Sequence, residues 1–134
     1  MLVPVIFFPG TCAEAHKLYQ KAFDMAVKEV VYNKDVPEDY LDEPLNDENQ
    51  YLVVHSECNI RGIRINMSDA GDTLKADGMV HFNVFVSSDD EVRKIFDDLK
   101  EGAEVESEPQ TVFWSSLHCS LRDRFGVNWQ IMTE

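Results

Sequence analysis

Cysteine and positive charge are both scarce in this sequence. The three cysteines are an odd number with no CxxC pair, which argues against a disulfide framework and is typical of reduced thiols in the cytoplasm. Lysine and arginine number 12 against 25 aspartates and glutamates, so the formal net charge is −13. Nucleic-acid binding needs basic residues that replace the counterions of the phosphates. We therefore expect a cytoplasmic protein whose partners include neither nucleic acid nor an anionic membrane.

Long hydrophobic runs are also lacking. A membrane-spanning helix needs about 18 to 20 consecutive apolar residues, and no such run occurs. The apolar segment 1–8 has no basic residues before it, is interrupted by Pro4 and is followed by Pro9, which favours a strand over a signal peptide. The composition, 44% hydrophobic and 28% charged, is that of a globular protein. At 134 residues we expect one domain over residues 1–134.

The chain contains an internal repeat. Residues 80–86 have the pattern of a largely buried strand, a capping box follows at 88–91, and an apolar-striped helix then runs to Gly102. The same order occurs 77 positions earlier, with a strand at 3–8 and a capping box at 11–14. The last parts of the two copies also correspond, now 64 positions apart. We infer a duplicated unit, with copies at about 3–69 and 79–133.

Each copy is predicted to be strand, helix, strand, strand, strand. The later strands are expected at 26–32, 51–58, 61–67, 104–106, 111–119 and 127–132. A one-sided sheet with one helix leaves an apolar face that needs cover. The prediction is therefore an α+β fold, in which two tandem βαβββ units form a curled mixed sheet, a cup, with the helices on its outer face.

Four motifs, at 8–15, 54–57, 67–70 and 123–129, occur in an order that resembles the vicinal oxygen chelate superfamily. That superfamily includes glyoxalase I, the bleomycin-resistance proteins and the extradiol dioxygenases. Within it the sequence is most similar to the PhnB-like branch, and the resemblance covers essentially the whole chain. It implies a homodimer with a small-molecule site in the sheet cup.

The resemblance also implies where metal ligands would lie. The superfamily's ligand positions fall on Pro4, Asn66, His81 and Gln130. Proline has no side-chain donor, and neutral amides bind divalent transition metals weakly compared with carboxylate or imidazole. His81 is the only competent ligand of the four. We therefore expect no divalent metal cofactor, although one remains possible.

Alternation along the strands predicts which polar residues face the cup. The predicted ligand-binding residues are Arg64, Asn66, His81, Asn83, Phe85, Trp114, Asn128 and Gln130. Arg64 is the only cation among them, and Glu57, water or a ligand should meet its charge because an unpaired buried charge is costly. Ile6 and Phe8 are expected as apolar walls. The other interpretation is that the amides only hydrogen-bond one another beneath a closed cup.

The remaining histidines and tryptophans have simpler expected roles. His16 is predicted at the surface or rim of the first helix, and His55 and His118 lie on comparable strands of the two copies. Trp129 alternates away from Gln130, so it should pack beneath a helix. Trp114 belongs either to the core or to a dimer interface, where aromatic residues are enriched.

Three hypotheses on function remain open. The first is a glyoxalase-like, PhnB-type protein that binds a small polar molecule without metal. The second is a metal-dependent lyase or dioxygenase that uses His81 with a rearranged set including His55 and Glu57. The third is a resistance protein that sequesters a cationic drug, which the negative charge would attract. A methyltransferase, the description that some relatives carry, is not supported, because no glycine-rich loop follows a strand.

Overall fold

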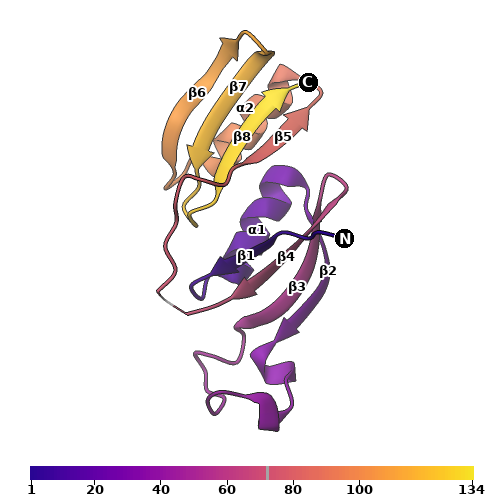
Figure 1. Cartoon of the computed structure of the whole chain (residues 1–134), viewed down its shortest axis with the longest axis vertical. Helices are drawn as coiled ribbons and strands as arrows, with labels where there is room; N and C mark the ends of the chain where they lie inside the picture. The colour runs from indigo at the N-terminus through magenta and orange to yellow at the C-terminus, as the bar shows by residue number, and fades with distance from the viewer. Residues whose placement is uncertain (72) are drawn as a thin grey trace. The chain divides into compact units, whose positions relative to one another are not determined.

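The computed structural model describes residues 1–71 and 73–134, and it divides the chain into two compact units. Unit 1 is Met1–Leu74 and unit 2 is Lys75–Glu134. Both units contain a four-stranded mixed sheet and one long helix, and their strands and helix follow one another in the same order along the chain (Figure 1). The duplicated βαβββ unit and the α+β class are therefore confirmed.

Unit 1 is built on the sheet order β1-β4-β3-β2. Its elements are β1 (Val5–Phe8), α1 (Cys12–Phe23), β2 (Ala26–Tyr32), β3 (Val53–Ile60) and β4 (Ile63–Asp69), with short 3-10 turns at Asn33–Asp35 and Glu38–Tyr40. Strand β1 is parallel to β4, and the other pairs are antiparallel. Arg61 and Gly62 both have positive φ and form the tight turn between β3 and β4, as a two-residue hairpin requires.

Unit 2 repeats this arrangement with the order β5-β8-β7-β6. Its elements are β5 (Phe82–Val86), α2 (Asp89–Leu99), β6 (Glu104–Val112), β7 (Ser115–Arg122) and β8 (Asn128–Thr133). Strand β5 is parallel to β8. The prediction of a short strand at 104–106 is wrong, because β6 pairs with β7 as far as Val112 despite several register shifts.

The helix of each unit covers one face of its own sheet. In unit 2 the helix α2 packs against the sheet, and the buried residues Val84 and Val86 of β5 and Trp129 and Ile131 of β8 lie on one side of that sheet. Trp129 is 1% exposed, which confirms that it packs beneath a helix. Alternation then turns the residues between these positions toward the opposite face, which we call the helix-free face.

The two helices begin differently, although the sequence predicts the same capping box for both. Ser88 accepts a hydrogen bond from the backbone N–H of Glu91 at 3.2 Å. Thr11 makes no such bond; the N–H of Cys12 donates instead to the Asp69 carboxylate at 2.9 Å. A charged acceptor at a helix N-terminus bonds more strongly than a hydroxyl. The capping box predicted for the first helix is therefore wrong.

Neither α1 nor α2, nor any other helix among residues 1–71 and 73–134, is long and apolar enough to cross a membrane.

Candidate functional site

The helix-free face of unit 2 carries most of the predicted site. On β5, Asn83 and Phe85 are exposed while Val84 and Val86 are buried beneath α2. On β8, Asn128 and Gln130 alternate with the buried Trp129 and Ile131. The predicted sidedness of β5 and β8 in this unit is therefore correct.

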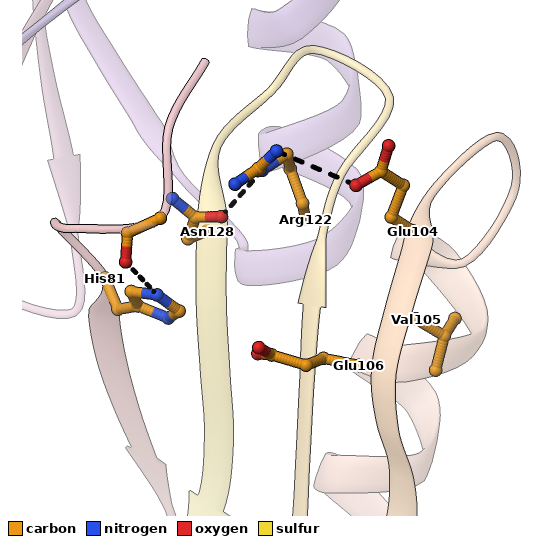
Figure 2. A pocket seen from close by; sticks show the side chains of 7 residues that line it. His81, Glu104, Val105, Glu106, Arg122 and Asn128 are labelled. Carbon is orange, nitrogen blue, oxygen red and sulfur yellow. Dashed lines mark hydrogen bonds and ion pairs between the residues drawn. The ribbon is translucent and has the colours of Figure 1, made fainter.

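A cavity of about 240 Å³ opens on this face. We call it the unit 2 cavity, and Figure 2 shows the side chains that line it. Its polar lining comes from the segment before β5 and from strands β6, β7 and β8: His81, Glu104, Glu106, Arg122 and Asn128. The sequence predicts His81 and Asn128 as site residues but neither glutamate nor Arg122.

Arg122, at the end of β7, is held by its neighbour on β8. Its Nε–H donates to Asn128 Oδ1 at 3.0 Å. Asn128 Nδ2 in turn donates to the backbone carbonyls of Asp77 at 2.6 Å and Val80 at 2.9 Å. Asn128 therefore uses both ends of its amide, so it serves as a clamp that fixes Arg122 and the segment before β5.

Glu104 is only loosely associated with Arg122. The distance from Arg122 NH1 to Glu104 Oε2 is 3.7 Å, and the Glu104 side chain is 81% exposed. This separation exceeds the range of a hydrogen bond, and exposed ion pairs contribute little to stability. The outer nitrogens of the guanidinium thus remain open to a stronger anionic partner.

His81 and Glu106 reach the cavity from opposite sides (Figure 2). His81 Nε2 lies 2.9 Å from the carbonyl oxygen of Gly78. Since a carbonyl only accepts, Nε2 carries the proton and Nδ1 is the lone-pair acceptor. That Nδ1 is buried and has no hydrogen-bond partner among residues 1–71 and 73–134. Glu106 is fixed by Ser120, whose hydroxyl donates to Oε2 at 3.3 Å.

Gln130 lies farther along β8 and pairs with His118 of β7. His118 Nε2 is 3.0 Å from Gln130 Oε1, and the ring of Trp114 meets the His118 ring edge-on with centroids 5.5 Å apart. His118 is buried, whereas Trp114 is 53% exposed and the adjoining Phe113 is 96% exposed. Trp114 is therefore a surface residue of unit 2.

Arg64 and Asn66 occupy the corresponding face of unit 1. Arg64 NH2 lies 3.3 Å from the Glu57 carboxylate, which Lys28 also approaches at 3.3 Å. Arg64 Nε–H donates to Asn66 Oδ1 at 3.1 Å. Arg64 is expected to meet Glu57, water or a ligand, and the structure shows the pair with Glu57.

The predicted apolar walls on β1 are wrong. Phe8 is fully buried and packs against Tyr19 of α1, with ring centroids 6.4 Å apart. By alternation Ile6 shares that side, so it is Val5 and Phe7, both about half exposed, that face the other way. The predicted alternation of the first strand is off by one position, which exchanges the residues that face the helix with those that face away from it.

The residues at the superfamily's metal-ligand positions do not fit a divalent metal. Pro4 contributes only its carbonyl, which accepts from the Asn66 N–H at 2.9 Å. The oxygens of Asn66 and Gln130, the atoms by which amides bind metals, accept hydrogen bonds from Arg64 and His118. Nor do residues 1–71 and 73–134 contain a group of three His, Cys, Asp or Glu able to hold a metal ion.

His16 is buried, so its predicted position at the surface or rim is wrong. It is 7% exposed, and its Nε2 lies 2.9 Å from the Ser56 hydroxyl. That hydroxyl donates to the carbonyl of Met67 at 2.7 Å, so Nε2 is the donor to Ser56. The thiols of Cys12 and Cys58 lie 3.6 Å and 3.7 Å from the same nitrogen. The missed signal was the spacing of 12, 16, 19 and 23, which places these residues on the buried face of α1.

Burial shifts the pKa values of His16 and of the three cysteines. It raises the pKa of Cys12 to about 12, with the nearby Asp69 charge adding to the effect. Burial likewise raises the pKa of Cys58, and raises that of Cys119 to about 11. Burial lowers the pKa of His16, although Asp69 opposes this. These cysteines are therefore protonated at neutral pH and are poor nucleophiles.

Two βαβββ units, each with a helix-free polar face, are the architecture that the resemblance to the vicinal oxygen chelate superfamily implies. A family model described as 3-demethylubiquinone-9 3-methyltransferase matches residues 1–132, and the chain belongs to this PhnB-like family. The resemblance inferred from the four motifs is thereby confirmed.

Particular relatives span nearly the full chain. Protein YjdN of Escherichia coli (strain K12) is 27% identical over 137 residues, covering 97% of this chain and 92% of that protein. The solved structure of a PhnB protein from Bacillus cereus aligns with 99% of this chain and 98% of its own, with a TM-score of 0.83 and 16% identity. FosX, a fosfomycin resistance protein from Listeria monocytogenes, aligns with 100% of this chain and 90% of its own, with a TM-score of 0.66 and 11% identity. At these identities the two structures show the common fold alone.

Proposed function

We propose that this protein binds a small polar molecule on the helix-free face of its sheets, without a bound divalent metal, and that the unit 2 cavity is the binding site. The observation that carries the proposal is the convergence of five polar side chains on one cavity from four separate segments. Ligand sites commonly combine a concave surface with a few fixed polar groups that orient the ligand.

The polar groups of the cavity are fixed by bonds that leave other atoms free to meet a ligand. Asn128 holds Arg122 through Nε, so the remaining guanidinium nitrogens can donate. Ser120 holds one oxygen of Glu106. Such prior positioning favours binding, because less side-chain entropy is lost when the ligand arrives.

A metal-dependent enzyme is the weaker candidate. It would need His81 together with His55 and Glu57, yet Glu57 already pairs with Arg64 and Lys28. The methyltransferase activity in the family's description is not part of the proposal, since the sequence has no glycine-rich loop after a strand.

The test is a fragment screen followed by NMR titration of the ¹⁵N-labelled protein. The screen should include cationic antibiotics, so that drug sequestration is examined as well. We expect hits that shift the backbone amides of His81, Glu106 and Arg122 and that lose at least tenfold in affinity in Arg122→Gln. The control is Arg93→Gln, which removes an exposed arginine from α2 on the other side of the sheet. The proposal would be overturned by hits that shift none of these cavity amides, or by hits that bind Arg122→Gln and Arg93→Gln with equal affinity.

We also propose that the protein acts as a cytoplasmic homodimer. Phe113 and Trp114 form an exposed aromatic pair with ring centroids 4.7 Å apart at the turn between β6 and β7. Exposed aromatic pairs of this kind are enriched at protein interfaces. Light scattering coupled to size-exclusion chromatography should give twice the chain mass, and a mass of one chain at all concentrations would contradict this.

A further inference from the structure

Two opposite charges line the unit 2 cavity without pairing with each other. Arg122 comes from β7 and Glu106 from β6, and both line the cavity. The charged partner of Arg122 is Glu104 at 3.7 Å, and the partner of Glu106 is the neutral hydroxyl of Ser120. In the part of the chain that the structure describes, no ion pair joins Arg122 to Glu106. Unpaired opposite charges facing one small cavity are the complement of a molecule that carries both charges.

We infer that the ligand of this cavity is a small amino-acid-like zwitterion, whose carboxylate binds Arg122 and whose ammonium binds Glu106 and His81. This inference rests on the proposed function and names the ligand class of the same site. An anion alone would leave Glu106 facing it without compensation, and a cation alone would do the same to Arg122. A monoanion therefore meets the unfavourable charges of Glu104 and Glu106, and a monocation meets the unfavourable charge of Arg122.

Glu106 and His81 offer acceptors on the side of the cavity away from Arg122, whereas Glu104 lies beside it. Figure 2 shows Glu106 extending across β7 toward His81, while Arg122 lies nearer the strand ends. An ammonium has three donors and no acceptor. The second Glu106 oxygen and the Nδ1 lone pair of His81, which has no partner among residues 1–71 and 73–134, supply acceptors for two of them. An acceptor buried without a partner is costly, and a ligand donor would remove that cost.

The guanidinium of Arg122 is the matching donor for a carboxylate. Its Nε is used by Asn128, so the ligand carboxylate would meet the outer nitrogens. The ligand carboxylate would displace Glu104 from Arg122. The Glu104 side chain is 81% exposed, and its distance of 3.7 Å from Arg122 is too long for a hydrogen bond. Displacing it costs little, because exposed ion pairs are weak.

The volume limits the size of the zwitterion. About 240 Å³ is smaller than the roughly 300–1,000 Å³ of pockets for drug-sized ligands. The cavity therefore suits a molecule of a few carbon atoms between its charged ends rather than a peptide or a nucleotide.

The test compares three probes with the same three-carbon skeleton: β-alanine, propionate and propylamine. Binding is followed by NMR titration of the cavity amides at neutral pH. We expect β-alanine to bind at least tenfold more tightly than either monopole. In Glu106→Gln its advantage over propionate should disappear, and in Arg122→Gln its advantage over propylamine should disappear. Each ratio is measured on one protein sample, so it does not depend on small differences in stability between variants.

The outcomes separate this inference from the proposed function. If propionate or propylamine shifts the cavity amides as strongly as β-alanine does, the ligand class is wrong and the binding site stands. If β-alanine binds more tightly but Glu106→Gln keeps the full advantage, the assigned role of Glu106 is wrong. If neither these probes nor any compound of the wider screen moves a cavity amide, the proposed function itself fails.

Discussion

His118 donates its Nε2–H to the side-chain oxygen of Gln130 across strands β7 and β8, at 3.0 Å. Gln130 stands at one of the positions where metal-dependent members of the superfamily place a ligand. Its oxygen is the only atom with which a glutamine side chain binds a metal well, and here that oxygen already accepts a hydrogen bond. In this chain Gln130 therefore works as a hydrogen-bonding residue.

The first prediction concerns metal content. Protein purified without a tag or chelator, then incubated with Ni, Zn, Mn or Fe(II), should retain far less than one equivalent per chain. The reason is that the amide oxygens of Asn66 and Gln130 are engaged and carry no charge. Elemental analysis makes the measurement. Near one equivalent that is lost in His81→Ala would contradict the absence of metal and favour the enzyme hypothesis.

The second prediction concerns Asn128. Asn128→Ala removes two donors to the carbonyls of Asp77 and Val80 and one acceptor from Arg122. We expect a loss of about 1 to 3 kcal/mol in the free energy of unfolding, measured by urea denaturation, with faster hydrogen exchange before β5. The control Asn83→Ala removes an exposed amide from the same face and should change stability by less than about 0.5 kcal/mol. If both variants changed the free energy of unfolding equally, the hydrogen bonds of Asn128 would make no special contribution to stability.

The third prediction is a pH dependence caused by His16. Burial lowers its pKa below the unfolded value of about 6.5, so the unfolded chain binds the proton more readily. The stabilisation is fully present above about pH 6.5 and is lost as the pH falls toward the folded pKa, by at most about 1.4 kcal/mol per pH unit.

The measurement compares the wild type with His16→Gln between about pH 7.5 and 5.5. The other histidines titrate in both proteins, so the difference between the two curves isolates His16. The wild type should lose more stability than the variant over this range. Parallel curves would mean that His16 is protonated as easily in the folded as in the unfolded chain.

The fourth prediction separates the two helix starts. Ser88→Ala removes the hydroxyl that accepts from Glu91, and should cost about 1 kcal/mol. Thr11→Ala removes a hydroxyl with no capping bond, so we expect a change below about 0.5 kcal/mol. Thermal or urea unfolding of the pair makes the comparison, each variant serving as the control of the other. A costly Thr11→Ala would indicate that the hydroxyl caps α1 in solution.

The sequence alone was sufficient for the repeated unit, the order of its strands and helices, and most of the sidedness of the later strands. These properties are local, because side chains alternate with period two in strands and 3.6 in helices. Trp129 beneath a helix and Asn83 on the opposite face follow from that period. The same reasoning failed at Ile6 and Phe8, where an error of one position reverses the face.

The tertiary structure decided which residues meet. Parity can assign Arg122 to the same face as Ser120 and His118, but only the registers of β6, β7 and β8 bring Arg122 to Asn128 and Glu106 to Ser120. His16 was misplaced for the same reason, since its partner Ser56 is 40 residues away. Pairings between distant segments depend on how whole elements pack, and no local period encodes them.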